Sequence, residues 1–230
     1  MTPPIESSSP SRRILVTGAA GALGRSVVSA FLDHGDRVFG THFPGHPPKD
    51  QNGPEWIAAD LSERSEVRAL FDRVGGVDAV VHCAGGFRFS TAESISDEDL
   101  RFLISVNFES AYFVASAAIP GMKERGGGSL LFVSSLATRT GASGVSAYVA
   151  TKSAVNGLVL SLSEELKTAG IRVNAVLPST IDTEANRRDM PKADFSKWVP
   201  TAEIAELLRT LTLPKSKSIT GALIAMPGGL

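Results

Sequence analysis

The stretch that decides the fold is ILVTGAAGALGRSVVSAFL, residues 14–32. A short apolar run leads into three glycines, Gly18, Gly21 and Gly24, and the apolar spacing of a helix comes next. Glycines in such a turn let the backbone approach a pyrophosphate, and the helix N-terminus offers free N–H groups and the positive end of a dipole. The stretch therefore predicts a strand, a phosphate-binding turn that also includes Leu23, and a helix.

Composition sets the class of protein. The chain has 230 residues, 43% of them hydrophobic, and a net formal charge of −1, which describes a soluble globular protein. The near-neutral charge, without a basic stretch, argues against nucleic acid or a membrane surface as a partner. The single cysteine, Cys83, precludes an intrachain disulfide and fits a reducing compartment, so a cytoplasmic location is expected.

The beginning of the chain differs from the rest. Residues 1–11 are rich in proline and serine and contain no apolar run, so they predict a disordered tail rather than a signal peptide. We expect no segment that approaches the roughly 20 apolar residues of a membrane span. The remainder, residues 12–230, contains no linker or repeat and predicts one domain.

Short apolar runs alternate with helical patterns through this domain. Several of the runs are continuous, as buried parallel strands are. The alternation predicts an α/β fold, a single Rossmann domain with a doubly wound parallel sheet of about seven strands. Strands are expected to begin at Arg13, Arg37, Glu55, Asp78, Ser129, Arg172 and Ala222. Helices are expected over residues 21–34 and 63–74, from residue 97 with Ser96 as N-cap, and over 146–169 with Gly170 as the stop.

One crossover lacks a helical pattern. Residues 42–54, HFPGHPPKDQNGP, contain four prolines, which predict an irregular loop in place of a helix. His42 and His46 are four residues apart, but Pro44 prevents a helix, so we expect solvated side chains and no metal site.

The second predicted strand ends at His42, where a carboxylate would accept the ribose 2′-hydroxyl of NAD. Without that carboxylate a 2′-phosphate is not repelled, so NADP is slightly favoured over NAD. The loop contains no arginine that would clamp the phosphate. Lys49 in the loop, or Arg25 at the start of the first helix, could reach it, but the sequence does not fix either position. Asp60, after the third strand, could accept from the adenine amine with Leu61 beneath the ring. Equally, Asp60 or Ser62 could simply cap the next helix.

Two further stretches suit a bound nucleotide and its reaction. HCAGG ends the fourth strand, and Ala84, Gly85 and Gly86 would leave an open backbone edge for a ribose. YVATK places Tyr148 and Lys152 four residues apart in a helical pattern, so a weak acid and a fixed cation share one face.

Together these motifs resemble the short-chain dehydrogenase/reductase family along nearly the whole chain from Arg13. The resemblance implies a nicotinamide cofactor and a catalytic set that corresponds here to Asn107 in SVNFES, Ser135 in FVSSLA, Tyr148 and Lys152. The segment NAVLPSTIDT also matches the family, and it implies that Pro178, Ile181 and Thr183 flank the nicotinamide.

Some positions depart from the family pattern. The second glycine of the turn is at 21 rather than 22, Cys83 stands where the family has asparagine, and Ser179 comes after Pro178 where glycine is usual. Residues 179–198 are similar to quinonoid dihydropteridine reductase, which shares GALG and Ala-Gly-Gly. That group lacks the serine corresponding to Ser135 and carries an aspartate at the second strand, which this chain lacks.

The chemistry implied is hydride transfer between the nicotinamide and a carbonyl or alcohol. Tyr148 would be the general acid and base, and we expect Lys152 and the nicotinamide cation to lower the pKa of its phenol. Ser135 would hold the substrate oxygen, Lys152 the nicotinamide ribose, and Asn107 a water that relays protons. Three alternatives remain open at this stage: a redox sensor that binds the nucleotide without turnover, a dihydropteridine-reductase-like enzyme, and a sugar-nucleotide epimerase.

Substrate and assembly are less constrained. Phe87 and Arg88 come after the fourth strand, where ligands dock in such sheets, and Arg88 could equally be a surface residue. Trp198 could contact substrate or pack a lid. The helical patterns around residues 107–119 and 146–160 carry apolar residues on more than one face, which predicts a homodimer or homotetramer.

Overall fold

The computed structural model describes residues 11–48 and 53–229. Its main sheet has seven parallel strands in the order β3-β2-β1-β4-β5-β6-β9. The chain reverses its direction of winding between β1 and β4, which creates a crevice at the carboxyl ends of these strands. The predicted Rossmann sheet is confirmed. Its strands are β1 Arg13–Thr17, β2 Arg37–His42, β3 Glu55–Ala58, β4 Ala79–His82, β5 Gly128–Val133, β6 Ile171–Pro178 and β9 Leu223–Met226.

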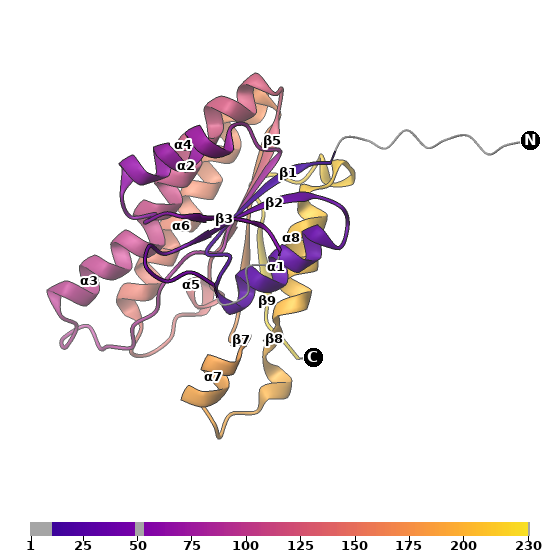
Figure 1. Ribbon diagram of the computed structural model, residues 1–230. Helices are drawn as coiled ribbons and strands as arrows, with labels where there is room; N and C mark the ends of the chain where they lie inside the picture. Colours follow the sequence, from indigo (N-terminus) through magenta and orange to yellow (C-terminus); the bar gives the residue numbers. More distant parts are fainter. Residues whose placement is uncertain (1–10, 49–52, 230) are drawn as a thin grey trace, which may run out of the picture.

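Helices cover both faces of the sheet (Figure 1). On one face lie α2, α4 and α6, whose apolar residues share a core with alternate residues of the strands. On the other face lie α1 and α8, which pack against each other and against a second core. The helices are α1 Ala22–Leu32, α2 Arg64–Val74, α3 Asp97–Leu103, α4 Ser110–Glu124, α5 Ala137–Thr140, α6 Ser146–Glu165, α7 Glu184–Asp189 and α8 Thr201–Thr212.

Local signals set several of the helix ends. The Ser96 hydroxyl accepts a hydrogen bond from the Asp99 amide at 3.1 Å and caps α3 as predicted. After α6, a 3₁₀ turn Lys167–Ala169 leads to Gly170, whose φ of 69° is the left-handed conformation of a C-terminal glycine. A two-stranded sheet of β7 Ile181–Asp182 and β8 Val199–Pro200 follows β6. It joins the two ends of the segment that contains α7.

The proline-rich crossover is irregular where it is described. Residues 43–48 and 53–54 form turns and bends and contain no helix, because proline lacks the amide hydrogen that a helix needs. The tail, residues 1–10, and Lys49, which was considered as a contact for a 2′-phosphate, lie outside the described residues.

The expectation that no segment approaches the apolar length of a membrane span was wrong. In the part of the chain that the structure describes, α3, a π-helical turn Ile104–Glu109 and α4 form a continuous helix, Asp97–Glu124, long and apolar enough by composition to cross a membrane. A core helix passes the same test. Ala111, Val114 and Ala118 pack this helix against the core of the sheet, so we interpret it as a core helix.

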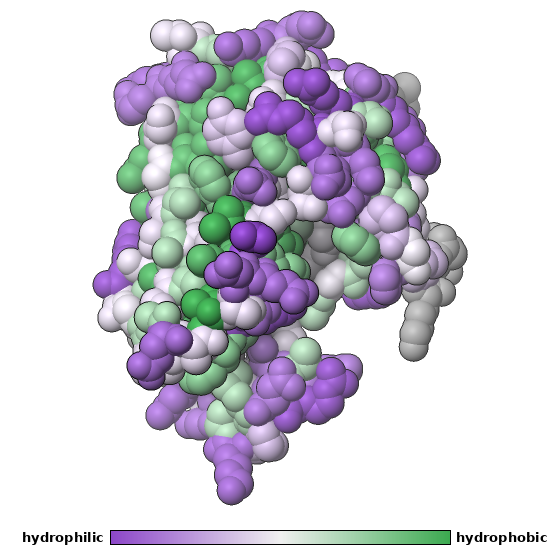
Figure 2. Space-filling view, turned by 90° about the vertical axis from the view of Figure 1, so that its left-hand side faces the viewer, coloured by the Kyte–Doolittle hydropathy of each residue, from purple (hydrophilic) through white to green (hydrophobic). Residues whose placement is uncertain are grey.

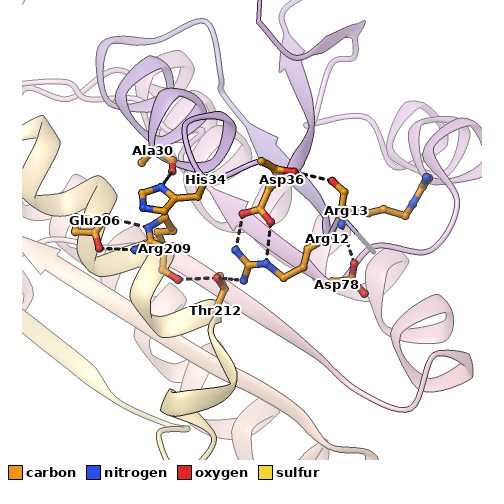
Figure 3. Close-up of polar contacts among 11 residues, drawn as sticks. Arg12, Arg13, Ala30, His34, Asp36, Asp78, Glu206, Arg209 and Thr212 are labelled. Carbon is orange, nitrogen blue, oxygen red and sulfur yellow. Dashed lines mark hydrogen bonds and ion pairs between the residues drawn. The ribbon is translucent and has the colours of Figure 1, made fainter. Parts of the chain in front are cut away.

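At the amino ends of the strands, Arg12, which precedes β1, forms an ion pair with Asp36, which precedes β2, and a hydrogen bond with the end of α8 (Figure 3). The Arg12 guanidinium donates to both carboxylate oxygens of Asp36, at 2.9 and 2.5 Å, and to the Thr212 hydroxyl at 2.9 Å. The Asp36 side chain is only 6% exposed and that of Arg12 25%. Such a bidentate, largely desolvated pair is stronger than an exposed one.

Removal of this carboxylate should destabilise the fold. We expect Asp36→Ala to lower the free energy of unfolding by about 2–3 kcal/mol, somewhat less than for a fully buried pair, because it leaves the Arg12 charge without its partner. Glu164→Ala, which breaks the exposed i,i+3 pair with Lys167, is the control and should change the free energy by less than about 0.5 kcal/mol. Urea denaturation measures both, and equal effects would contradict the prediction.

Candidate active site

A cavity of about 680 Å³ opens at the carboxyl ends of the first four strands. Seven of the predicted cofactor-binding residues line it: Gly18, Gly21, His42, Asp60, Leu61, Ala84 and Gly85. These residues come from four separate turns, one after each strand, and parallel strands bring the turns to one edge of the sheet. The cavity therefore lies where the glycine turn predicted a nucleotide.

The glycine turn fits closely against the loop after β4. Gly18 has a φ of 66°, and a Cβ at this position would lie 2.7 Å from the Ala84 nitrogen. A Cβ at Gly24 would overlap the Gly18 carbonyl. Gly21 is the N-cap of α1, and its amide donates to the Gly18 carbonyl at 3.0 Å. The first turn of α1 thus presents amide groups beside a cradle that any side chain would fill, as pyrophosphate binding requires.

At the end of β2, the His42 ring lies edge-on to Trp56, with ring centroids 6.3 Å apart, and its Nδ1 is 3.0 Å from the Phe43 carbonyl. Arg25 reaches back to the glycine turn, where its Nε donates to the Ala20 carbonyl at 3.0 Å. Ala20 lines the cavity, so Arg25 is bonded to one of its lining residues without itself being part of the lining.

Asp60 uses one carboxylate oxygen within its own turn. Its Oδ1 accepts from the amide of Ser62 at 3.0 Å and from the hydroxyl of Ser62 at 2.6 Å. The N-cap of α2 is Glu63, so the expectation that Asp60 or Ser62 caps this helix was wrong. The turn instead fixes the Asp60 carboxylate at the wall of the cavity.

Asn107 and Lys152 meet beneath the loop after β4. The Asn107 side chain is buried in the π-helical turn, where its Oδ1 accepts from the Gly86 amide and its Nδ2 donates to the Gly86 carbonyl, both at 3.0 Å. It also donates to the Thr151 hydroxyl at 3.2 Å. A Cβ at Gly85 would lie 2.9 Å from the Asn107 Oδ1 and 3.0 Å from the Lys152 Nζ, so a side chain at this position would force these groups to shift.

Tyr148 and Lys152 share one face of α6, one turn apart, as predicted. The Ser135 hydroxyl is a hydrogen-bond partner of the Tyr148 phenol. The Phe87 ring packs edge-on against the Tyr148 ring, with centroids 5.1 Å apart, and Phe87 itself is 53% exposed. The phenol therefore lies between a hydroxyl that can hold a substrate oxygen and an accessible aromatic surface.

The pKa of the Tyr148 phenol is shifted in the direction opposite to the one predicted from the sequence. Burial raises the pKa of the Tyr148 phenol, and the hydrogen bond from Ser135 only partly opposes it. The sequence predicted a lowered pKa, but the Lys152 ammonium donates to the Val133 carbonyl at 3.0 Å rather than to the phenol. Burial also lowers the pKa of Lys152 to about 8, and the neighbouring Cys83 opposes this.

Two of the three substrate candidates are engaged elsewhere. The Arg88 Nε donates to Asp99 at 2.9 Å, and its guanidinium stacks on Phe102 at 4.1 Å, which supports the alternative of a surface ion pair. Trp198 is 8% exposed and packs on Phe195, with ring centroids 4.7 Å apart, which favours packing over substrate contact.

Other predicted residues lie around the cavity rather than in its described lining. Leu23 packs into the core beside α1, and Gly86 packs on Phe102 and Val106. Pro178 ends β6, Ile181 lies in β7, and the Thr183 hydroxyl caps α7 by accepting from the Asn186 amide at 3.1 Å. Asn107, Ser135, Tyr148 and Lys152 likewise stand outside that lining.

The sequence did not single out several lining residues. Thr41 accepts from the Gly18 amide at 3.1 Å, and Cys83 precedes the predicted Ala84. Arg101, Phe102, Ser105 and Val106 line the cavity from the helix that begins at Asp97. The cap at Ser96 marks the helix but no local motif marks these four positions, so only the packing of the helix over the loop after β4 reveals them.

Comparison with known proteins agrees with this arrangement. Residues 12–194 match the family described as short chain dehydrogenase. The chain belongs to the short-chain dehydrogenase family. It is 30% identical to a tropinone reductase homolog of Arabidopsis thaliana over 95% of this chain and 91% of the relative. It is 32% identical to dihydropteridine reductase of Dictyostelium discoideum over 93% and 94%.

Solved structures of short-chain dehydrogenases have the same fold. A short-chain type dehydrogenase/reductase from Mycobacterium ulcerans superposes with a TM-score of 0.88 at 25% identity, over 95% of this chain and 89% of that one. Short-chain dehydrogenases use NAD(P), and the glycine cradle of this chain fits such a cofactor. Among the described residues, no group of three or more His, Cys, Asp or Glu could hold a metal ion.

The buried Lys152 should make stability depend on alkaline pH. Its pKa is about 8 in the folded chain, below the ordinary value of 10.5. Below pH 8 the Lys152 ammonium is charged in both states, and its burial destabilises the folded state. Between pH 8 and 10.5 Lys152 is mostly neutral in the folded chain but still charged in the unfolded chain. Relative to Lys152→Met, wild-type stability should therefore rise over that interval by about 1.4 kcal/mol per pH unit.

Urea denaturation of both proteins between pH 7 and 10.5 measures this difference, in which groups common to both proteins largely cancel. A wild-type protein that loses stability relative to Lys152→Met over that interval would contradict the prediction.

Proposed function

We propose that this short-chain dehydrogenase transfers hydride between NAD(P) and a small carbonyl or alcohol substrate, with Tyr148 as the general acid and base. The observation that carries the proposal is the convergence of Ser135, Tyr148, Lys152 and Asn107 beside the glycine cradle. A redox sensor without turnover has no need of this set.

The residues have distinct roles in this proposal. When bound, the nicotinamide supplies or accepts the hydride. In reduction, the Tyr148 phenol gives its proton to the substrate oxygen while the Ser135 hydroxyl holds that oxygen. The Lys152 ammonium holds the nicotinamide ribose, and the Asn107 amide holds a water through which the phenol regains its proton. The protonated phenol is the form of Tyr148 that serves reduction, and the phenolate is the form that serves oxidation.

Tyr148→Phe should keep cofactor affinity and lower turnover by at least about 10²-fold, because the ring stays and only the proton donor is lost. Tyr112→Phe is the matched control, because Tyr112, the other tyrosine, is 44% exposed on α4. A screen of carbonyl substrates with NADH and NADPH supplies the assay. Turnover by Tyr148→Phe close to that of the wild type with any good substrate would refute the mechanism.

A dihydropteridine reductase activity is the second candidate. It is favoured by the 32% identity to that enzyme of Dictyostelium discoideum over nearly the whole chain and by the exposed Phe87 ring beside Tyr148. A flat heterocycle could stack on such a ring. Ser135 favours a carbonyl substrate instead, so the screen should include a quinonoid dihydropterin beside ketones, 3-oxoacyl thioesters, steroids and sugars.

We propose a modest preference for NADPH over NADH. His42 brings no negative charge against a 2′-phosphate, and Arg25 is bonded to a lining residue of the same cavity. We expect roughly 5–30-fold tighter binding of NADPH. His42→Asp should reverse the preference, because a carboxylate repels the phosphate and accepts from the ribose hydroxyl of NADH.

Fluorescence titration of both cofactors, on the parent and on His42→Asp, measures the preference. Tighter NADH binding by the parent would reverse this assignment. An unchanged preference in His42→Asp would show that this position does not read the ribose.

We also propose a cytoplasmic homodimer or homotetramer. The view from the side of α2, α3 and α4 shows hydrophobic residues gathered over part of that face (Figure 2). Leu100, Ile104, Tyr112 and Leu160 are 37–48% exposed on α3, the π-helical turn, α4 and α6, and a second copy could cover them. Sedimentation at micromolar concentration should give a mass well above the 24.1 kDa monomer. A mass near that value would count against assembly.

A further inference from the structure

His82, the last residue of β4, connects two parts of the site that are far apart in sequence. Its imidazole is 3% exposed. The Nδ1 atom lies 2.8 Å from the Thr17 hydroxyl, at the end of β1, and the Nε2 atom lies 3.3 Å from the Ser110 hydroxyl, where α4 begins. Both ring nitrogens therefore have partners, one on each side of the crevice.

The direction of these hydrogen bonds is set by Ser110. Its hydroxyl donates to the Val106 carbonyl at 2.6 Å, and a hydroxyl has only one hydrogen to donate. The Ser110 oxygen must therefore accept from the Nε2–H of His82. Nδ1 then carries the lone pair and accepts from the Thr17 hydroxyl. The chain of hydrogen bonds runs in one direction from Thr17 through His82 and Ser110 to Val106.

The end of this chain lies in the π-helical turn. In a regular α-helix, the amide of residue 110 would donate to the carbonyl of residue 106. Here the Ser110 amide donates to the Ser105 carbonyl instead, and the Ser110 hydroxyl occupies the Val106 carbonyl. The side-chain bond thus replaces a backbone bond that the π-turn gives up. The same turn carries Asn107 toward Gly86 and Thr151.

We infer that His82 is a positioning residue that couples the glycine turn, through Thr17, to the π-turn that carries Asn107. The imidazole suits this role because burial, with a further contribution from the Lys152 charge, lowers its pKa to about 3. It stays neutral at working pH and keeps the Nδ1 lone pair. The consequence for turnover rests on the proposed role of Asn107, whereas the coupling itself does not.

Hydrogen exchange measured by mass spectrometry on the full chain tests the coupling without a substrate. Thr17→Val is nearly isosteric, and position 17 is remote in sequence from residues 104–110. It should nevertheless speed exchange at those residues by about 3–10-fold, the effect of one lost hydrogen bond, and leave α6 unchanged. Ser129→Ala is the control. Ser129 is buried on neighbouring β5, and its hydroxyl has no hydrogen-bond partner among the described residues, so exchange should not change.

Substitution of His82 itself supplies the rescue test. His82→Leu should loosen the π-turn at least as much as Thr17→Val, and His82→Gln, whose side chain carries both an N–H donor group and a carbonyl acceptor, should restore most of the protection. Adding Thr17→Val to His82→Leu should have little further effect, because both changes interrupt the same bond between Thr17 and His82. With a substrate from the screen, His82→Leu should lower kcat more than it raises the substrate KM.

Three results would overturn the inference. The first is unchanged exchange at residues 104–110 in both Thr17→Val and His82→Leu. The second is a uniform rise over the whole molecule, which would show general destabilisation. The third is a His82→Gln variant no better protected than His82→Leu. The turnover of Tyr148→Phe tests only the proposed function, and the exchange experiments test only the coupling. The failure of one idea can therefore be told apart from the failure of the other.

Discussion

The space at Gly85 constrains the rest of the site. The Asn107 amide and the Lys152 ammonium both lie close enough that a Cβ at position 85 would meet them within 2.9–3.0 Å. A Rossmann sheet brings its glycine turn and its β4 loop to one edge whatever residues the loop contains. A side chain at this position would force the Asn107 amide or the Lys152 ammonium to shift from its present place. The cavity and the catalytic set are therefore parts of one packing arrangement.

That arrangement buries polar groups, and each one has to find a partner. Lys152 donates to the Val133 carbonyl, Asn107 bonds Gly86 and Thr151, and His82 is bonded on both ring nitrogens. The lowered pKa of Lys152 shows that its burial is unfavourable for stability. We interpret this as a requirement of the role proposed for Lys152, because a solvated lysine would not hold a ribose in fixed geometry.

Several features of the fold could be predicted because their signals are local. The glycine spacing at residues 18–24, the apolar strand runs, Ser96 as a cap and Gly170 as a stop each act within a few residues. The Tyr148–Lys152 pair shares a helix face by periodicity alone. Other features could not be settled because one side chain has several possible partners. The cap considered for Asp60 or Ser62 competes with a bond between those two residues, and the partner of Arg88 proved to be Asp99 across a loop.

By itself, the sequence determined the Rossmann sheet, the position of the glycine turn and the residues that resemble a dehydrogenase set, because periodicity and spacing are properties of neighbouring residues. Only the tertiary structure decided that the pKa of Tyr148 is raised, that Trp198 is buried and that His82 joins β1 to the π-turn. These outcomes depend on which groups surround a side chain after the strands and helices pack. That environment is assembled from segments as far apart as residues 17 and 110.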